Sequence, residues 1–334
     1  MPVSTTARPR SVWLLTDGKA GDLAQCTGVA EALGVPFEIR TVSPKPPFSW
    51  WLPFGPTDFR EWENRPDSPL RPPYPDLVIA SGRRAAAYLR RIKRKSHGRV
   101  FTVFLKDPRT GPGAADMIWV PEHDALRGSN VLVTVTAPHR YQTPKLSELA
   151  AEPVPALDRL PQPRVAVLAG GNSRHHMFTD ADEDAFLSGL KTLVADKGAG
   201  LMITASRRTP DRLSTGLQEL AAANGHFFWA GGPDNPFGHM LAKADAIVAT
   251  ADSTNMIGEA AATGKPIHVF HPSGGHRKIT QFLNRLEAMG AAHPFPGPLK
   301  TTTYEPIDAT PEIAKAILTA YASRQQQDKD GAPR

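Results

Sequence analysis

The sequence predicts an α/β protein with two Rossmann-like parallel-sheet domains that face a cleft. Two observations lead to this prediction. Short apolar runs of strand length alternate with helix-prone stretches along most of the chain, which is the pattern of β-α-β units in a parallel sheet. The 334 residues also exceed what one hydrophobic core usually supports, so we expect two domains.

The clearest β-α-β unit is Ala244–Pro272, which contains an apolar run, a small polar turn, an Ala-rich helical stretch and a second apolar run. The turn places Ser253 and Thr254 at a helix N-terminus, which favours an anion or a phosphate ester. Glu259 lies about one and a half turns into that helix. Its carboxylate can pair with vicinal hydroxyls such as those of a ribose. The alternative is an ordinary capped helix with a solvated Glu.

Strands are expected wherever an apolar run has strand length, including the two runs of this unit. They are residues 11–16, 37–42, 76–80, 100–105, 117–120 and 130–135 in the first half, and 165–169, 201–205, 227–230, 246–249 and 267–270 in the second. Polar clusters recur directly after these strands, at the edge where open α/β sheets bind ligands.

The domain boundaries follow the local composition. We expect one α/β domain over residues 1–150 and a second over residues 164–310. Residues 144–163 are proline-spaced and typical of a linker. Residues 311–334 are expected to form a helix that ends near Arg324 and crosses back onto the first domain, followed by a disordered tail.

The net charge of +6 is unevenly distributed. Up to residue 160 the chain has 22 Lys and Arg against 16 Asp and Glu, whereas the remainder has 17 of each. The N-terminal half is therefore expected to face an anionic partner, namely a phosphorylated substrate, a membrane surface or nucleic acid. Nucleic acid is the least favoured because no recognised binding motif accompanies the charge.

The sequence also bears on the cellular setting. No apolar run approaches the roughly 20 residues of a transmembrane helix, and the polar residues 1–10, expected to be disordered, lack the apolar core of a signal peptide. The single cysteine, Cys26, excludes an intrachain disulfide and fits a reducing compartment. We expect a cytoplasmic protein, with peripheral attachment to the inner face of the membrane as an extension of that expectation.

Residues 44–75 are rich in proline and aromatic residues, so they cannot form a regular element. Two interpretations remain open: an amphipathic surface that seats on a membrane or a lipid-linked acceptor, and an excursion that packs on its own domain. The helix that follows has a basic ridge in two rows, Arg83, Arg90 and Arg94 beside Arg84, Arg91 and Lys95. Such a ridge suits anionic head groups, although it is also typical of a solvated face.

The second half contains a candidate phosphate loop. Gly170-Gly171-Asn172-Ser173 follows a strand and is expected to offer unhindered backbone amides to a phosphate, with Arg174 in reach. Ser206 and Arg207, after the next strand, are counted with this donor set. Together with Ser253, Thr254 and Glu259, these residues are expected to converge on one phosphorylated nucleotide.

The C-terminal half resembles the GT-B glycosyltransferases, in which a glycine loop and a helix N-terminus hold the diphosphate of a nucleotide-sugar and a helical Glu binds the ribose. The pattern Ser253-Thr254-x4-Glu259-Ala260-x3-Gly264-Lys265-Pro266 is similar to that of the UDP-N-acetylglucosamine transferase of peptidoglycan synthesis.

Nearly the full chain resembles the family named for the plant mitochondrial-fission protein Elm, whose bacterial members are described as glycosyltransferases or nucleoside-diphosphate-sugar epimerases. The matching stretches are Asp17–Gly21, Ser81–Arg83, Lys106–Arg109, Pro121-x-His123-Asp124, Gly170-Gly171, Ser206–Pro210 and Asp252-Ser253-x2-Met256-x2-Glu259-Ala260. This resemblance implies a GT-B-like fold and a nucleotide-sugar as donor substrate, with no separate cofactor and no metal site.

The resemblance to GT-B glycosyltransferases implies that the general base for an acceptor hydroxyl lies in the N-terminal domain. Asp17 is the first candidate and His123 the second. The residues expected to hold the acceptor are Gly18, Lys19, Arg83 and Arg109, with Lys19 and Arg109 on a phosphate. A structural role in a turn is the alternative for each of them.

These observations predict a metal-independent glycosyltransferase that moves a sugar from a nucleotide-sugar to an envelope glycolipid or a lipid-linked acceptor. The epimerase description is disfavoured because the N-terminal turn lacks Gly-x-Gly-x-x-Gly. The alternative from another class is a non-catalytic, membrane-associated GT-B-like scaffold with a role in fission or morphology.

Overall fold

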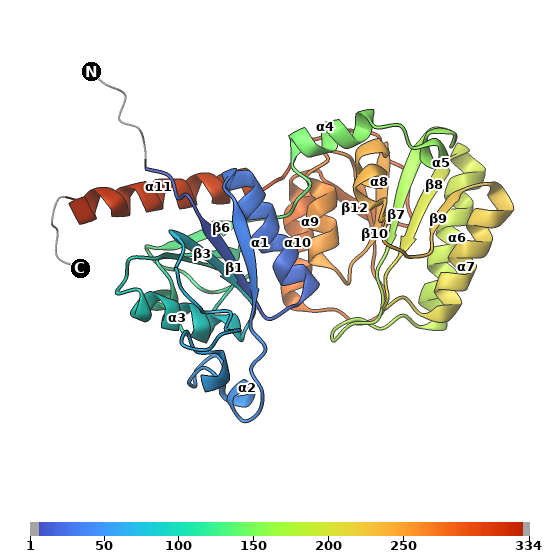
Figure 1. Cartoon of the computed structure of the whole chain (residues 1–334). Helices are drawn as coiled ribbons and strands as arrows, with labels where there is room; N and C mark the ends of the chain where they lie inside the picture. Colours follow the sequence, from blue (N-terminus) through green and yellow to red (C-terminus); the bar gives the residue numbers. More distant parts are fainter. Residues whose placement is uncertain (1–6, 330–334) are drawn as a thin grey trace, which may run out of the picture. The chain divides into compact units, whose positions relative to one another are not determined.

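A computed structural model describes residues 7–329, which form two compact units. Within the described residues, unit 1 comprises residues 7–140 together with 309–329, and unit 2 comprises Tyr141–Asp308. Each unit is built on a six-stranded, all-parallel sheet with helices packed against it (Figure 1). The predicted α/β class with two Rossmann-like sheets is therefore confirmed.

The sheet of unit 1 has the strand order β2-β1-β3-β4-β5-β6. Its strands are β1 (Val12–Thr16), β2 (Phe37–Thr41), β3 (Leu77–Ser81), β4 (Phe101–Leu105), β5 (Met117–Pro121) and β6 (Val131–Thr134). Its helices are α1 (Ala20–Leu33), α2 (Phe48–Trp51), α3 (Ala85–Lys95) and α11 (Thr310–Lys329), with short 3-10 turns at Phe59–Glu61 and Pro112–Ala114.

Both faces of this sheet are covered. Alternate residues of β1, Val12 and Leu14, pack with α1 and α11, whereas Trp13 and Leu15 pack with α3. A strand that is buried on both faces reads as a continuous apolar run, which explains why the sequence revealed it. Cys26 is fully buried on α1, and burial raises the pKa of its thiol, as expected for a packing residue.

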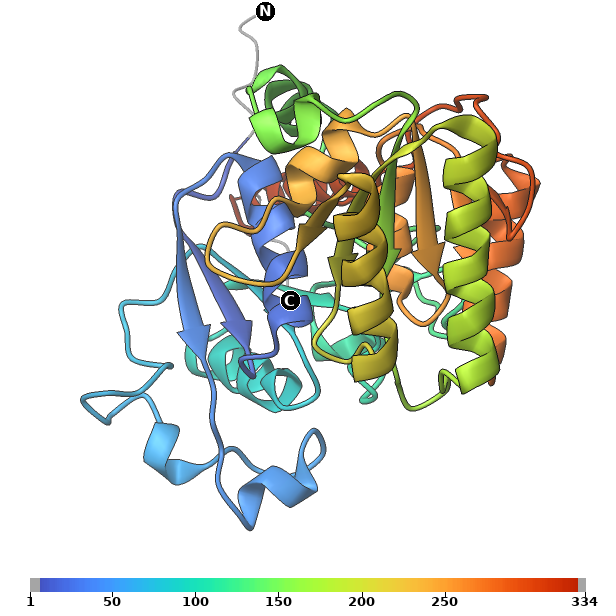
Figure 2. The same ribbon diagram turned by 90° about the vertical axis from the view of Figure 1, so that its right-hand side faces the viewer.

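The sheet of unit 2 has the strand order β12-β11-β10-β7-β8-β9. Its strands are β7 (Arg164–Ala169), β8 (Gly200–Ala205), β9 (Phe227–Trp229), β10 (Ala246–Thr250), β11 (Ile267–Phe270) and β12 (Ala292–Phe295). Its helices are α4 (Thr143–Ala151), α5 (Pro155–Asp158), α6 (Asp180–Lys197), α7 (Asp211–Asn224), α8 (Phe237–Lys243), α9 (Thr254–Ala261) and α10 (Arg277–Ala288). Figure 2 shows α6 and α7 side by side over one face of the sheet.

The division between the units differs from the one expected from composition. It falls after Arg140, whereas residues 144–163 contain α4 and α5 and belong to unit 2. The reason is that α4 packs along α8, with Leu146 and Leu149 buried. The proline spacing that suggested a linker instead places Pro144 and Pro155 in the first turns of these helices, where proline is well tolerated.

The C-terminal helix α11 packs against α1, as expected, and buries Ile313, Ile317 and Tyr321 in the core of unit 1. It continues to Lys329, so the tail predicted after Arg324 is wrong for residues 325–329. An ion pair of 3.6 Å between Arg324 and Asp328, one turn apart, supports this extension. Residues 330–334 and 1–6, both predicted to be disordered, lie outside the described residues. Residues 7–10 do have fixed contacts, since the Arg10 amide donates to Asp76 over 2.7 Å.

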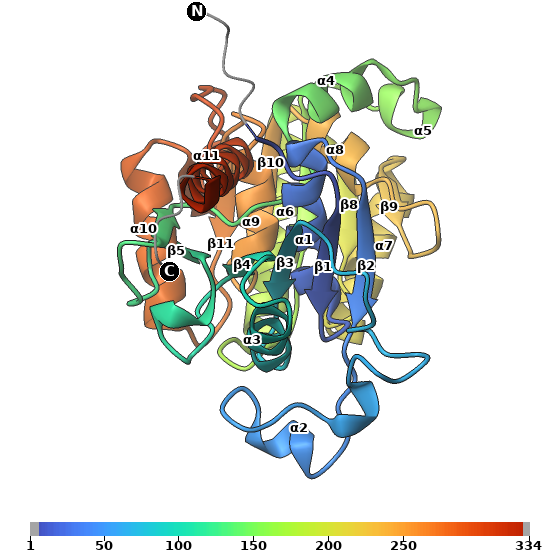
Figure 3. The same cartoon turned by 60° about the vertical axis from the view of Figure 1, so that its left-hand side comes forward.

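The excursion over residues 44–75, which contains α2, lies below α3 in Figure 3. Its Leu52 and Leu70 are buried in one core cluster with residues of α3. Glu63 also accepts hydrogen bonds from Arg91 over 2.8 and 3.1 Å and pairs with Lys95 at 3.2 Å. The expectation of an open basic ridge on this helix is therefore wrong for Arg91 and Lys95 of its second row, because their charges hold the excursion. The interpretation that the excursion packs on its own domain is confirmed for these contacts.

We expect Ile317→Ala to lower the free energy of unfolding of unit 1 by about 2–5 kcal/mol, because it leaves a cavity under α11. The exposed neighbour Lys315 is the matched control, and Lys315→Ala should change stability by no more than about 0.5 kcal/mol. Tryptophan fluorescence during urea unfolding reports mainly on unit 1, since five of the six tryptophans lie there. Equal losses in the two variants would contradict the placement of α11 in this core.

Candidate functional site

The two sheets each reverse their strand order at one point. In unit 2 the chain runs outward from β7 to β9 and then returns to the other side of β7 as β10. In unit 1 the same reversal occurs between β1 and β3. Open α/β sheets bind ligands at the carboxyl ends of the strands beside such a switch point. The loops after β7, β10, β1 and β3 are therefore the candidate sites of the two units.

In unit 2 the buried carboxylate of Asp252 joins these loops. Its Oδ2 accepts from Arg208 Nη2 over 2.8 Å and from the Gly171 amide over 3.1 Å, while its Oδ1 accepts from Thr250 Oγ1 over 2.7 Å. Arg208 also donates to the carbonyl of Asn172 over 2.9 Å. The segments after β7, β8 and β10 are thus fixed to one another by a single acidic side chain.

The two glycines after β7 are required because Asp252 and the backbone of Arg208 lie very close to them. A Cβ atom at Gly170 would lie 2.0 Å from Asp252 Oδ1, and one at Gly171 would lie 2.0 Å from the carbonyl oxygen of Arg208. Both distances are far below van der Waals contact, so any side chain at either position would displace the loop. The sequence motif therefore marks a tightly packed junction.

The prediction that the backbone amides of this loop are free to bind a phosphate is wrong. Gly170 donates to Thr250 Oγ1 over 2.8 Å, and Gly171 donates to the Asp252 carboxylate. The amides of the next two residues, Asn172 and Ser173, donate to backbone carbonyl oxygens over 3.0 and 2.9 Å. All four amides are used inside the protein, so this loop presents side chains, including the exposed Arg174, in place of an amide cradle.

The cluster after β8 is partly engaged inside the protein. Pro210 occupies the N-cap of α7, and the Thr209 hydroxyl donates to the Gly170 carbonyl. Ser206 Oγ accepts from the Arg208 amide over 3.1 Å, which shapes the turn. Arg207 is exposed beside it. Of this cluster, Arg207 is therefore the residue whose side chain is open to a ligand.

The start of α9 is built as the sequence predicts. Ser253 is its N-cap, with Oγ accepting from the Met256 amide over 3.4 Å, and Thr254 opens the helix. Glu259 lies further along and is partly buried, yet among the described residues its carboxyl group has no hydrogen-bond or ion-pair partner. Burial raises the pKa of the Glu259 carboxyl to about 7. A carboxyl group in this state is ready to receive a hydrogen-bond donor.

Sequence reasoning missed a histidine cluster at the same edge of the sheet. The loops after β7 and β11 are joined by hydrogen bonds from Met177 to Ser273 over 2.9 Å and from Gly275 to His175 over 2.7 Å. This brings the rings of His175 and His276 to 4.2 Å. His176 is buried, and burial lowers its pKa. No local motif links these residues, because they meet only through the fold.

In unit 1 the switch point collects two carboxyl groups and two lysines. Asp17 follows β1 with its side chain 2% exposed, and its Oδ2 pairs with Lys19 at 3.1 Å. Asp22 on α1 pairs with Lys106 at 2.6 Å. A Cβ at Gly82 would lie 2.9 Å from Asp17 Oδ1 and 3.2 Å from Asp22 Oδ2, so both carboxylates border the same glycine. Asp17 Oδ1 is buried with no hydrogen-bond partner in the described structure.

The other predicted residues of unit 1 are not all brought to this point. His123 follows β5, which is three strand spacings, or about 14 Å, from β1 in the sheet. The two alternative candidates for the general base, Asp17 and His123, therefore follow strands that are not neighbours in the sheet of unit 1. Arg83 follows β3 directly and is exposed, as is Arg109 in the turn after β4. Gly18 has a φ of +82° in the turn between Asp17 and Lys19, which explains the glycine.

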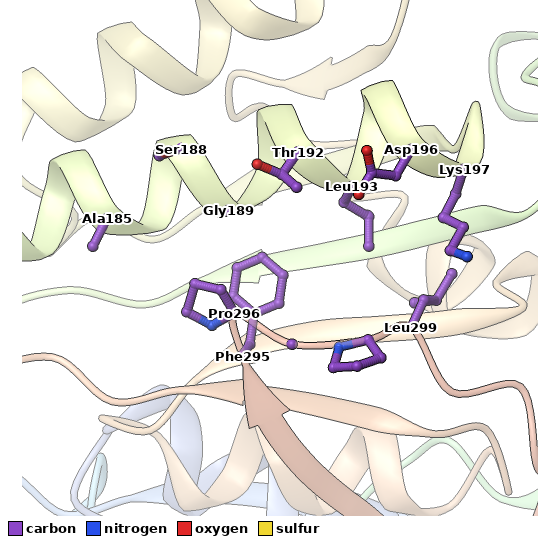
Figure 4. A pocket seen from close by; sticks show the side chains of 12 residues that line it. Ala185, Ser188, Gly189, Thr192, Leu193, Asp196, Lys197, Phe295, Pro296 and Leu299 are labelled. Carbon is purple, nitrogen blue, oxygen red and sulfur yellow. The ribbon is translucent and has the colours of Figure 1, made fainter.

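A separate pocket of about 340 Å³ lies between α6 and the loop after β12 (Figure 4). Its lining is largely apolar and includes Leu193, Phe295, Pro296 and Leu299, with Lys197 at one end. None of the predicted site residues lines it. The pocket therefore has no part in the candidate donor site at the switch point.

The sequence of this chain is similar to a protein family and to proteins of two organisms. The family model described as mitochondrial fission ELM1 matches residues 20–321. The mitochondrial fission protein ELM1 of Arabidopsis thaliana is 28% identical over 277 residues, and the match covers 75% of this chain and 65% of the plant protein. An uncharacterized protein of Rickettsia prowazekii is 24% identical over 353 residues, with 93% of this chain and 98% of that protein covered.

Among solved structures, the UDP-GlcNAc 2-epimerase of Methanocaldococcus jannaschii is similar at a TM-score of 0.55 and 12% identity, over 92% of this chain and 99% of that one. MnaA of S. aureus, in a structure with UDP, is similar at a TM-score of 0.52 and 10% identity, over 95% and 87%. Likenesses at such identities establish the GT-B-type fold alone. The family follows from the match over residues 20–321, and this chain belongs to the mitochondrial fission ELM1 family.

Proposed function

We propose that this protein transfers a sugar from a nucleotide-sugar to an anionic, lipid-linked or glycolipid acceptor of the cell envelope, at the inner face of the membrane and without a metal ion. The observation that carries the proposal is Glu259. Its partly buried carboxyl group has no protein partner and lies on the helix that starts at the switch point of unit 2. The cis-diol of a ribose supplies the two donors that such a group lacks.

The surroundings of Glu259 support a phosphorylated ligand. Ser253 and Thr254 mark the positive end of the α9 dipole, and the exposed Arg174 and Arg207 follow the neighbouring strands β7 and β8. These groups are suited to stabilise the charge of a leaving diphosphate. Proteins of the same fold bind such donors, since a structure of the M. jannaschii epimerase contains UDP-GlcNAc and UDP.

Unit 1 supplies the acceptor side in this proposal. Asp17 is the general base in this proposal, because its Oδ1 has no hydrogen-bond partner in the described residues and can accept the proton of an acceptor hydroxyl. The ion pair between Asp22 and Lys106 positions the neighbouring carboxylate beside Gly82. Lys19, with its side chain 65% exposed, and the exposed Arg109 hold the phosphate of the acceptor. His123 has no assigned role in this arrangement.

A second candidate is a non-catalytic scaffold. It is favoured by the loop from Gly170 to Ser173, whose amides are all engaged inside the protein and leave no amide cradle for a diphosphate. A GT-B-like protein that no longer binds a nucleotide-sugar would need hydrogen bonds within the protein to satisfy these backbone amides. The two candidates differ in one property, which is the binding of a nucleotide.

We expect one of UDP, GDP, CMP and ADP to bind, and Glu259→Gln to weaken that binding by about 10- to 100-fold through loss of a charged hydrogen-bond acceptor. Isothermal titration calorimetry measures both. Glu219→Gln, at an exposed position of α7, is the matched control and should bind like the wild type. If none of the four nucleotides binds the wild type, the transferase proposal fails and the scaffold is the better candidate.

The raised pKa of Glu259 also predicts a pH dependence of stability. The folded state holds the proton up to about pH 7, whereas an unfolded Glu loses it near 4.5, so the wild type loses stability as pH rises from 4.5 through 7. Gln stays neutral. Glu259→Gln should therefore equal the wild type near pH 4.5 and exceed it by about 3 kcal/mol at pH 8. Urea unfolding across this range tests it, and a difference that does not grow with pH would rule out the buried, unpartnered carboxyl group.

Asp17→Asn should slow the release of free nucleotide from the donor that binds by about 10²–10⁴-fold, because the amide cannot accept a proton. The same variant should bind nucleotide unchanged, since the donor residues belong to unit 2. Asp67→Asn, at an exposed position of the excursion, serves as the control. Unchanged turnover in Asp17→Asn would show that this carboxylate is not the base.

A further inference from the structure

Large aromatic side chains are exposed together on the excursion that follows β2. Trp50, Trp51, Phe54 and Phe59 are 71%, 53%, 72% and 46% exposed, and we call them the aromatic patch. Phe48 connects two of them, since its ring centroid lies 6.4 Å from that of Trp51 and 5.7 Å from that of Phe59. Contiguous exposed apolar side chains of this size mark interaction sites.

The exposure of the patch does not arise from a loose backbone. Leu52, between Trp51 and the next ring, is 2% exposed and packs in the core beside α3. Arg90 on α3 donates to the carbonyl of Pro53. Asp58 is 1% exposed and accepts from the Lys45 amide over 3.0 Å. The backbone is held at these points, so the rings between them are directed into solvent by the fold.

The stretch that contains the aromatic patch also contains the net positive charge of the chain. Residues 44–95 contain 11 Lys and Arg against 5 Asp and Glu, a net +6, and the rest of the chain has 28 of each. Several of these cations are paired within unit 1. Lys45, Arg65 and Arg94 are exposed, and among the described residues their side chains have no ion-pair partner. An apolar patch in a strongly cationic stretch is complementary to an anionic surface that has an apolar layer beneath it.

We infer that the aromatic patch inserts into the interfacial layer of an anionic lipid bilayer and holds the protein peripherally on it. Trp and Phe side chains are favoured at this depth, and basic residues nearby add attraction to anionic head groups. The patch acts from the surface, since α2 has only four residues and the described residues include no helix long and apolar enough to cross a membrane. The inference goes beyond sugar transfer and does not depend on it.

A second copy of the chain is a poorer occupant of the patch. The cores of protein interfaces are depleted of charge, whereas two patches brought together would oppose two stretches of net +6. An anionic bilayer has the opposite charge and accepts the same rings. The charge pattern therefore separates the two occupants.

Co-sedimentation of the full chain with vesicles tests the inference, using phosphatidylcholine alone and phosphatidylcholine mixed with phosphatidylglycerol. We expect binding to the mixed vesicles, weakened at least roughly tenfold by Trp50→Ser with Phe54→Ser, because two rings no longer leave water. The matched control is Ile39→Ser with Met289→Ser, which removes two exposed apolar side chains outside the patch and should bind like the wild type.

Two further readouts make the result decisive. Tryptophan fluorescence should shift to the blue on the mixed vesicles, and salt should weaken the binding. Binding that the serine variant retains in full would overturn the inference, because charge alone would then suffice. So would a wild type that ignores the vesicles but forms a dimer that the serine variant loses in sedimentation velocity. No nucleotide is present, so failure here would remove the membrane location from the proposed function and would leave nucleotide binding and sugar transfer to their own tests.

Discussion

The architecture of unit 2 at its switch point depends on one buried charge. A carboxylate as buried as Asp252 is unfavourable unless hydrogen bonds and a cation replace the water that it has lost. Arg208, Thr250 and the Gly171 amide provide this replacement. Because they come from the segments after three neighbouring strands, satisfying one side chain fixes the geometry of all three loops. The glycines follow as a steric consequence, since nothing larger fits beside the carboxylate.

Unit 1 repeats the arrangement with different residues. Asp22 is paired with Lys106 after β4. It also accepts a hydrogen bond from the hydroxyl of Ser81, the last residue of β3, over 3.2 Å. Gly82, with a φ of +98°, is the residue that both acidic side chains approach. In both units a carboxylate at the switch point holds the loops around it, and a glycine provides the room. Such a design keeps the carboxyl ends of the strands rigid before any ligand arrives.

The sequence was most informative where the signal is local. Strands buried on both faces read as apolar runs, and the Ser253 cap and the Thr179 capping box of α6 lie within a few residues. It failed where the partner is distant. The amides of Gly170 and Gly171 looked free because Thr250 and Asp252 are some 80 residues further along the chain. The basic residues of α3 looked solvated for the same reason, since Glu63 precedes them on an irregular segment that no periodicity reveals.

Two acidic residues of the same β10–α9 segment show how structural and functional groups can be told apart. Asp252 and Glu259 are both removed from bulk water, yet every oxygen of Asp252 has a donor and among the described residues Glu259 has none. An unpartnered carboxyl group whose pKa is raised by burial costs stability once the pH exceeds the pKa of the unfolded state, so the fold gains nothing by keeping it. A ligand that supplies the missing donors would remove this cost on binding. The unsatisfied acid and not the well-bonded one is therefore where the chemistry of this protein should be sought.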